Sequence, residues 1–577
     1  NNMAESDERY EIVVRNECAI VRSHSPQGLF RGAMTMMQLL IGTRSNSSRS
    51  SSSSSTDSQA QVQKQAPTAI VLPVITIRDG PKLQWRGLLL DVCRHFFDKD
   101  FVKRYIDLLA LYRMNVFHWH LTEDQAFRIE IKRYPKLTSV GAYRELRPDE
   151  LSDEAFMNEN KQYISTRRDS DGRTKMYYGG YYTQEDIREI VAYASDRFIR
   201  VVPEIELPGH AVASLAAYPE HSCTASSQSH HHHHHHHQQQ HPHQTVQFTV
   251  ENNWGVHKDV YCAGNDATFE FLENVLTEVI DLFPNSTHIH IGGDECPKDR
   301  WSVCPKCQQR IRDEHLGNEH GLQSYFIRRI GKFLASKNRQ FIGWDEILEG
   351  GLAPGAIVQA WRGMNGALEA VRMGHDAIAS PNSHCYLDYD INTIDLEHLY
   401  SFRPEAYVRR DDAMGRILGG EVNCWTEHMR TRDRVNYMVF PRLLAMSEVL
   451  WSEHRDTYYD FWKRVVQQRP VLHDLFQVRM GPETDLLHIV HRVHNRQTVF
   501  VRAYLKKPNT SIPRDKLELA YSLDETEPST PLRKSKAQSF KLGEEISFNV
   551  GQTMTIQAYL DGVPYGKHYH LLSSPSS

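Results

Sequence analysis

From residue 85 onward, short β-rich runs alternate with amphipathic stretches, and this alternation constrains the fold more than any other feature of the chain. Such alternation is typical of βα units, whose strands pair in parallel within one sheet. Eight units over about 370 residues predict a TIM (β/α)8 barrel with long loops. The runs with strand character are 86–92, 115–121, 198–206, 288–293, 340–344, 356–361, 376–380 and 417–424.

Helices are predicted between these runs. The stretch 267–283 shows the pattern best, because its apolar residues recur at spacings of three, four and seven. A final helix near 433–451 is expected to close the ring. The other clear candidates are 101–113, 183–197, 321–338 and 365–374.

The length of 577 residues predicts more than one domain. The barrel is expected over 83–455. Residues 1–82 are interpreted as a partial N-terminal α/β domain, with a strand in 8–16, a helix over 28–41 and a strand and turn in 67–82. Residues 456–577 form a C-terminal region. Alternating runs over 498–570 predict a small antiparallel β domain within it.

Two segments are low in complexity. Residues 44–66 are rich in serine, and residues 225–245 contain eight consecutive histidines followed by glutamines. Neither segment has enough apolar surface to stabilise an ordered structure, so both are expected to be disordered insertions.

Charge and hydropathy argue against two classes of partner. The net charge is −5, and no sustained run of lysine or arginine indicates nucleic-acid binding. No apolar stretch approaches the length of a membrane span. The opening NNMAESDERY is not a signal peptide, but three glycosylation sequons, at Asn46, Asn285 and Asn509, favour the secretory pathway. A secreted or lysosome-like location is therefore expected.

The predicted strand ends carry a distinctive set of side chains. In a TIM barrel the carboxyl ends of the strands form the active site. Carboxylates and an arginine at these ends could bind sugar hydroxyls, and tryptophan faces could stack on a sugar ring. The residues at or just after the eight ends are Arg94, Glu123, Asp124, Glu206, His210, Asp294, Glu295, Trp344, Trp361, Tyr386, Asp388, Trp425 and Glu427.

Asp294 and Glu295 are the strongest catalytic candidates. They follow two glycines directly at the end of a β-rich run. Glycines allow the sharp backbone turn that would bring both carboxylates into the mouth of the barrel. An Asp-Glu pair alone is more often a solvated turn, but this context favours function.

Several long motifs resemble the exo-acting β-N-acetylhexosaminidases, the family of lysosomal hexosaminidases and bacterial chitobiases. The resemblance covers about residues 83–455, and it extends to the small domains on either side. The motifs are WRGLLLDVCRHFF, MNVFHWHLTEDQAFRIEI, PEIELPGHA, HIGGDEC, GWDEIL and GGEVNCWTEH.

The resemblance implies substrate-assisted catalysis, in which the substrate's own 2-acetamido oxygen attacks the anomeric carbon. Glu295 would be the general acid and base, and Asp294 would hold the acetamido N–H while Tyr386 bonds its oxygen. The resemblance implies no cofactor and no catalytic metal, with an oligosaccharide or glycoconjugate as the substrate.

The remaining pocket residues receive supporting roles from the same resemblance. Arg94 and Glu427, with Asp388, would bind the outer hydroxyls, while Trp344, Trp361 and Trp425 would wall the pocket. His210 and Glu123 would set the protonation of Glu295. Glu123 and Glu206 stand where lysosomal members carry aspartate, which points to the bacterial-like branch.

Two other functions stay open at this stage. His118-x-His120 and His288-x-His290 could belong to a metal-dependent hydrolase on the same barrel, although hydrogen-bonded histidines of the barrel interior are favoured. A non-catalytic carbohydrate-binding protein would keep the pocket and lose the chemistry, which the retained Asp294 and Glu295 argue against.

The cysteines allow two interpretations. Cys304-x-x-Cys307 with Cys296 could hold zinc, but no fourth ligand is evident, so a structural role or free thiols are favoured. Cys223 and Cys262 flank the histidine-rich tract and could form a disulfide at its base, or remain free thiols.

Overall fold

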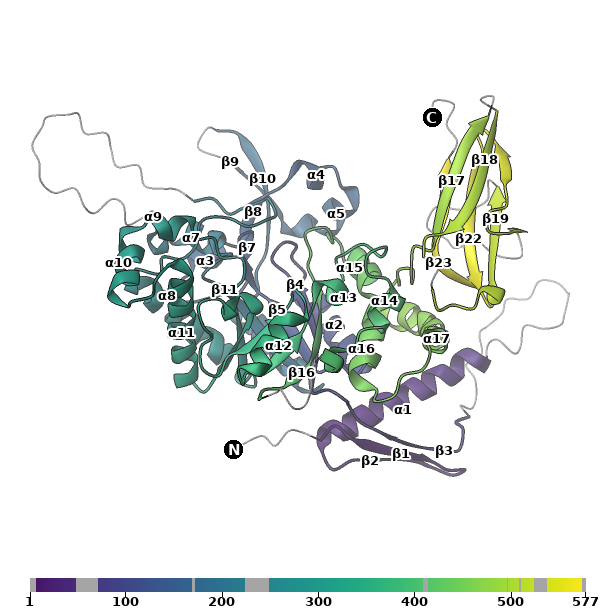
Figure 1. Cartoon of the computed structure of the whole chain (residues 1–577), viewed down its shortest axis with the longest axis horizontal. Helices are drawn as coiled ribbons and strands as arrows, with labels where there is room; N and C mark the ends of the chain where they lie inside the picture. The colour runs from purple at the N-terminus through teal and green to yellow at the C-terminus, as the bar shows by residue number, and fades with distance from the viewer. Residues whose placement is uncertain are drawn as a thin grey trace, which may run out of the picture.

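The computed structural model describes residues 7–47, 71–168, 172–223, 248–407, 414–494, 497–507, 510–523 and 537–572. Eight parallel strands close into a barrel at the centre of the molecule, in the order β11-β12-β13-β14-β15-β16-β4-β5 (Figure 1). Every strand lies within two residues of a predicted run, so the TIM-barrel prediction is confirmed. The strands are β4 (Trp85–Asp91), β5 (Val116–His120), β11 (Arg200–Leu207), β12 (His288–Gly292), β13 (Gln340–Trp344), β14 (Ile357–Ala360), β15 (Ala377–Ala379) and β16 (Ile417–Cys424).

Helices follow the strands on the outside of the barrel, largely as predicted. They are α2 (Lys99–Leu111), α6 (Gln184–Ser195), α8 (Asp266–Leu282), α11 (Glu319–Ser336) and α12 (Met364–Arg372). The single helix predicted over 433–451 was wrong. Two helices, α15 (Arg432–Val439) and α16 (Arg442–Trp451), meet at Pro441. Proline has no N–H to donate and its ring blocks the preceding turn, so the first helix ends before it.

The barrel interior changes from apolar to polar along its axis. One layer near the amino ends of the strands consists of Trp85, Val116, Val202, Ile342, Ile357 and Ile378. Above it, buried polar side chains hydrogen-bond to one another. Glu421 accepts hydrogen bonds from Trp85 Nε1 at 2.8 Å and from Gln359 Nε2 at 3.0 Å, for example. This polar layer carries the pocket described below.

The N-terminal residues form a small α/β unit against the barrel (Figure 1). Helix α1 (Pro26–Ser47) packs on the sheet β2-β1-β3, formed by β1 (Tyr10–Val14), β2 (Ala19–Arg22) and β3 (Ile75–Asp79). Buried Glu8 joins this unit to the barrel, because it pairs with Arg31 of α1 and with Arg86 of β4. Helix α1 ends at Ser47 rather than at residue 41, because it continues through Gly42, and a single glycine inside a helix is tolerated.

The serine-rich segment was therefore predicted to begin too early, because residues 44–47 are helical. The rest of that segment and the whole tract 225–245 lie outside the described residues.

The C-terminal region begins with α17 (Tyr458–Phe476) and continues into two antiparallel sheets, β17-β18-β21 and β20-β19-β22-β23. These sheets confirm a β domain, but it begins at Leu487 rather than near 498. Strand β17 is mostly exposed and carries histidines and an arginine, so its sequence lacks a strong alternation. The strands are β17 (Leu487–His494), β18 (Thr498–Leu505), β19 (Leu517–Leu523), β20 (Gln538–Phe540), β21 (Ile546–Asn549), β22 (Thr553–Leu560) and β23 (Val563–Leu572).

The loops after the barrel strands hold further short elements. Those near the pocket are α7 (Val212–Ala217), η2 (Pro219–His221), α9 (Asp299–Val303), α10 (Pro305–Asp313), η4 (Asp345–Leu348) and α13 (Asn382–Cys385). Among the helices of the described ranges, none has the length and apolarity that a membrane span requires.

Candidate active site

A pocket of about 210 Å³ opens at the carboxyl ends of the barrel strands. It is smaller than sites that hold drug-sized ligands, so it suits one sugar ring rather than an oligosaccharide. Twelve of the thirteen residues predicted from the strand ends line it, and Asp124 is the exception. The lining consists of Arg94, Glu123, Glu206, His210, Asp294, Glu295, Trp344, Trp361, Tyr386, Asp388, Tyr389, Trp425 and Glu427. Tyr389 was not predicted, although it follows the predicted Asp388 directly.

The turn after β12 presents Asp294 and Glu295. Gly292 and Gly293 have φ angles of 64° and 90°, a region that glycine adopts readily. A Cβ atom on Gly292 would lie 1.8 Å from the Glu206 carboxylate, so a side chain cannot fit there. Glu295 also has a left-handed φ of 41°, which is uncommon for a non-glycine residue. Gly292 and Gly293 therefore allow the backbone turn that presents the two carboxylates, as the sequence predicted.

The His210 imidazole contacts Asp294 and Glu295 through one nitrogen and the buried carboxylates of Glu123 and Asp124 through the other. Its Nε2 atom is 3.7 Å from Asp294 and 3.6 Å from Glu295. Its Nδ1 atom is 2.8 Å from Glu123 and 3.1 Å from Asp124. Burial opposes a charged imidazole, yet Glu123 and the other carboxylates raise the pKa of His210 well above its usual value. Asp124, predicted with Glu123 at the same strand end, contacts His210 and is not part of the pocket lining.

The environments of Asp294 and Glu295 differ. The Asp294 side chain is 15% exposed, and burial raises its pKa to about 7. The Glu295 side chain is 40% exposed, and the interaction with the His210 imidazole 3.6 Å away lowers its pKa. In the free pocket Asp294 therefore holds a proton more strongly than Glu295 does.

Three tryptophans wall the pocket, and buried carboxylates fix two of them. Trp344 Nε1 donates to Glu204 at 2.9 Å, and Trp361 Nε1 donates to Glu346 at 2.9 Å. Trp425 lies 5.9 Å from Trp344, centroid to centroid. Indole N–H groups that are held in this way keep the rings in place. Glu204 and Glu346 were not predicted as supports, since their partners lie far away in the sequence.

The far side of the pocket is charged. Arg94 contacts Glu123 at 3.3 Å and Glu427 at 3.6 Å. Burial raises the pKa of Asp388 to about 8. Asp388 Oδ1 and Asp294 Oδ1 are buried and have no protein partner within the described structure. Buried polar atoms are normally hydrogen-bonded, so these two oxygens are free to bind a ligand.

The histidines of the barrel interior form a carboxylate network. His118 Nδ1 lies 2.6 Å from Glu421. His120 Nδ1 lies 2.5 Å from Glu204, and His290 Nδ1 lies 2.7 Å from the other oxygen of Glu204. The favoured interpretation of His118 and His120 as hydrogen-bonded interior residues is confirmed. The network lies below the pocket and positions its walls through Glu204.

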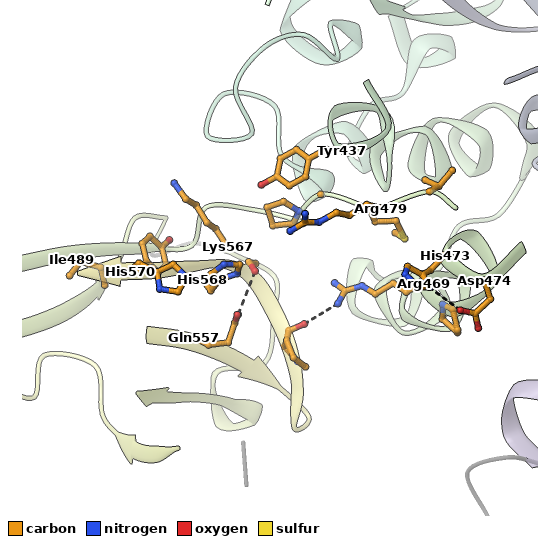
Figure 2. A pocket seen from close by; sticks show the side chains of 18 of the residues that line it. Tyr437, Arg469, His473, Asp474, Arg479, Ile489, Gln557, Lys567, His568 and His570 are labelled. Atoms are coloured by element: carbon orange, nitrogen blue, oxygen red, sulfur yellow. Dashed lines mark hydrogen bonds and ion pairs between the residues drawn. The ribbon is translucent and has the colours of Figure 1, made fainter. Parts of the chain in front are cut away.

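A second cavity, of about 950 Å³, lies between α17 and the C-terminal sheet (Figure 2). Its lining includes Arg469, Arg479 and Lys567 but only one carboxylate, Asp474. A cavity without paired carboxylates lacks the groups for general acid–base cleavage of a glycosidic bond. The smaller pocket of the barrel is therefore the candidate active site.

Comparison with known proteins agrees with this location. Residues 83–454 match the model of the glycosyl hydrolase family 20 catalytic domain. The chain belongs to glycosyl hydrolase family 20. It is 39% identical over 524 residues to a β-hexosaminidase of Porphyromonas gingivalis, covering 88% of this chain and 58% of that protein. It is 34% identical to a β-hexosaminidase of Vibrio furnissii, covering 66% of this chain and 58% of that protein.

Solved structures give the same result. A β-N-acetylhexosaminidase from Bacteroides fragilis superimposes with a TM-score of 0.64 at 30% identity, over 83% of this chain and 84% of that one. A family 20 exo-β-N-acetylglucosaminidase from Vibrio harveyi, solved in complex with N-acetylglucosamine, has a TM-score of 0.64 at 29% identity, over 82% of this chain and 68% of that one. The chain spans about 58% of the length of the two sequence relatives named above.

Proposed function

We propose that the chain is an exo-acting β-N-acetylhexosaminidase that removes terminal, non-reducing N-acetylglucosamine or N-acetylgalactosamine with retention of configuration. The observation that carries this proposal is that Asp294 and Glu295 both lie within 3.7 Å of one His210 nitrogen, in a pocket the size of one sugar. Family membership and the β-hexosaminidases among its relatives support the reaction type.

The first chemical step breaks the bond between the anomeric carbon and the glycosidic oxygen. Glu295 gives its proton to the departing oxygen while the acetamido oxygen bonds to the anomeric carbon. The product is a cyclic oxazolinium ion. Asp294 accepts a hydrogen bond from the acetamido N–H through Oδ1, which has no protein partner. Tyr386 bonds the acetamido oxygen and directs it toward the carbon.

The second step reverses these roles. Glu295 removes a proton from water, and the oxygen of that water attacks the anomeric carbon from the side that the leaving group vacated. The acetamide is then restored, and two inversions give net retention. A conventional retaining enzyme would instead need a carboxylate nucleophile about 5 Å across the scissile bond from the acid. Asp294 adjoins Glu295 and faces the same His210 nitrogen, so it is poorly placed for that role.

In the free pocket Asp294 holds a proton more strongly than Glu295 does. For this chemistry to proceed, bound substrate must reverse that preference, so that Glu295 is protonated and Asp294 is ionised. In the free pocket, the nearby His210 imidazole lowers the pKa of Glu295, and burial raises that of Asp294. A bound acetamido N–H and the positive charge that develops on it stabilise the Asp294 carboxylate. A leaving group over Glu295 removes water from it and favours its neutral form.

The remaining pocket residues bind the sugar. Arg94, Glu427 and Asp388 lie where they can bind outer hydroxyls, and Trp344, Trp361 and Trp425 cover the apolar faces of the ring. Glu123 acts through His210, since it contacts Nδ1 at 2.8 Å. Burial, together with the nearby Asp294 carboxylate, raises the pKa of Glu206 well above its usual value and so favours its neutral form.

An assay with aryl glycosides tests the proposal. An aryl β-N-acetylglucosaminide should be hydrolysed, and proton NMR should detect the β-anomer first. The matched aryl β-glucoside, which has a 2-hydroxyl in place of the acetamide, should be cleaved very poorly because it lacks the nucleophile. A thiazoline mimic of the intermediate should bind much tighter than substrate. Absence of turnover would leave a carbohydrate-binding protein, while a glycosyl ester on a carboxylate would end the substrate-assisted mechanism.

A secreted or lysosome-like location is also a proposal. The sequon asparagine Asn285 is exposed, which its glycosylation requires. A mobility shift of the native protein on treatment with an N-glycosidase supports the proposal. An unmodified Asn285 in the native protein removes this support.

A further inference from the structure

Four buried cysteines from three separate segments meet beside the loop that carries Glu295. The four-cysteine cluster consists of Cys223, Cys262, Cys304 and Cys307, whose residues are between 0% and 6% exposed. Their sulfur atoms all lie within 4.8 Å of one another. None of them forms a disulfide. Cys296, which the sequence suggested as a ligand, lies outside the cluster.

The local backbone brings these segments together. Ser222 and Tyr261 form an antiparallel bridge, and the Cys262 N–H donates to His221 O at 2.8 Å. Cys223 and Cys262 therefore enter the cluster side by side. A Cβ atom on Gly264 would lie 2.2 Å from the carbonyl carbon of Lys306, so only glycine allows this approach to the Cys304–Cys307 turn.

The distances within the cluster match a tetrahedral metal site. Cys223 and Cys262 each lie 3.7 Å from Cys307, and Cys262 lies 3.8 Å from Cys304, sulfur to sulfur. A disulfide would need about 2.05 Å. Four thiolates around one zinc ion at about 2.3 Å from the metal would be about 3.8 Å apart, which is the edge of that tetrahedron. The sulfur atoms are thus spaced as ligands of a single ion.

The surroundings favour thiolates rather than thiols. Cys304 is the N-cap of α10, and Cys307 lies in its first turn, where the helix dipole stabilises negative charge. Arg300 adds positive charge near Cys223. A tetrathiolate zinc site leaves a net negative charge, which these groups offset.

We propose that Cys223, Cys262, Cys304 and Cys307 bind one structural zinc ion that ties the loop after β11 to the loop after β12. The first loop carries His210 and the second carries Asp294 and Glu295. The site is closed, with four protein ligands and no open position, as in structural rather than catalytic zinc sites. Zinc also joins the two ends of the segment that contains the histidine-rich tract. The proposal does not depend on the substrate of the pocket.

Metal analysis of the full chain tests this proposal, provided that the eight consecutive histidines, His230–His237, are first replaced by serine so that they bind no metal. After dialysis against EDTA, elemental analysis should find about one zinc per chain, because buried tetrathiolate sites bind zinc tightly. The double variant Cys304→Ser/Cys307→Ser should retain less than about one tenth as much. Cys18→Ser, at an exposed cysteine, and Cys296→Ser, at a buried cysteine outside the cluster, should keep the full amount.

A spectroscopic measurement covers the case in which the double variant does not fold. The chain with all nine cysteines, grown with cobalt(II), should show the strong visible bands and the sulfur-to-metal charge-transfer band of tetrahedral tetrathiolate cobalt. Absence of these bands would overturn the proposal. So would a folded chain without zinc, iron in place of zinc, or two disulfides found by mapping of unreduced peptides.

The zinc site also has a kinetic consequence. Removal of the ion should lower kcat through Glu295, which lies nine residues before Cys304. The alkaline limb of the pH profile, which depends on a protonated Glu295, should move as well, because His210 and Glu295 no longer stay in contact. A zinc-free chain that keeps both kcat and the pH profile would show that the site does not position the acid.

Discussion

Replacement of Asp294 by asparagine should stabilise the fold and remove most of the activity. Burial raises the pKa of this carboxyl from 3.8 to about 7, so the folded chain prefers its neutral form. A shift of this size makes the carboxylate up to about 4 kcal/mol less stable in the folded chain than in the unfolded chain. Asparagine has nearly the same shape and carries no charge.

The sign of the pH dependence follows from the raised pKa. The stability cost of Asp294 is absent well below pH 3.8, grows as the pH rises through the unfolded pKa, and is complete above about pH 7. Between pH 5 and pH 8 the cost grows by about 2.5 kcal/mol. The Tm of Asp294→Asn should therefore exceed that of the unchanged chain, and the gap should widen from pH 5 to pH 8. Asp515→Asn, at an exposed carboxyl, is the control, and its Tm gap should be the same at both values.

The same substitution tests the catalytic role. If Asp294 steadies the acetamide as positive charge develops, kcat should fall by roughly 10²–10³-fold, the usual cost of one such interaction, while KM changes little. The low-pH limb of kcat/KM near pH 7 should also disappear, since that profile reports the free protein. A variant with unchanged turnover, or a Tm gap that narrows toward pH 8, would refute the account of Asp294.

Three further predictions concern other parts of the chain. Glu295→Gln should lower kcat by roughly 10²–10⁴-fold, and activity on a substrate with a highly activated aryl leaving group should suffer least, which steady-state kinetics on a leaving-group series measures. A uniform loss across that series would remove the acid role from Glu295. Brief treatment with a chelator should leave kcat unchanged, because no metal takes part at the reacting atoms; a loss that added zinc or manganese reverses at once would contradict this. Deletion of residues 225–245 should leave the Tm and the fold intact by circular dichroism, and insoluble expression of that variant would show that the tract has a structural role.

The barrel and the pocket lining could be predicted because both depend on local sequence. Each strand is a short β-rich run, and its carboxyl end lies where the run stops, so Asp294 and Trp344 were found by position alone. The double glycine before Asp294 gave a second, independent signal, since only glycine fits beside Glu206. The family resemblance then supplied roles that spacing could not.

The supports of the pocket were harder to predict, because their partners are remote in sequence. Glu204 accepts a hydrogen bond from Trp344, which lies 140 positions later in the sequence, and no local pattern links the two residues. Glu346 lies near its partner Trp361, yet an acidic residue in a loop is usually solvated. The break at Pro441 was visible in the sequence, but the apolar spacing on both sides of it suggested one continuous helix.

The cysteines show how a local motif can mislead when its partners are distant. Cys296 lies close to Cys304 and Cys307 in sequence, so it was the natural third ligand, but it is not a member of the cluster in the structure. The actual neighbours, Cys223 and Cys262, are 84 and 45 positions away from Cys307, and the histidine-rich tract separates Cys223 from the other three. Because those two cysteines flank the tract, a bond between them alone would only close the tract's base. Their contact with the Cys304–Cys307 turn has a larger effect, because it ties the loop of His210 to the loop of Glu295, the two loops whose separation sets the 3.6 Å contact between the imidazole and the acid.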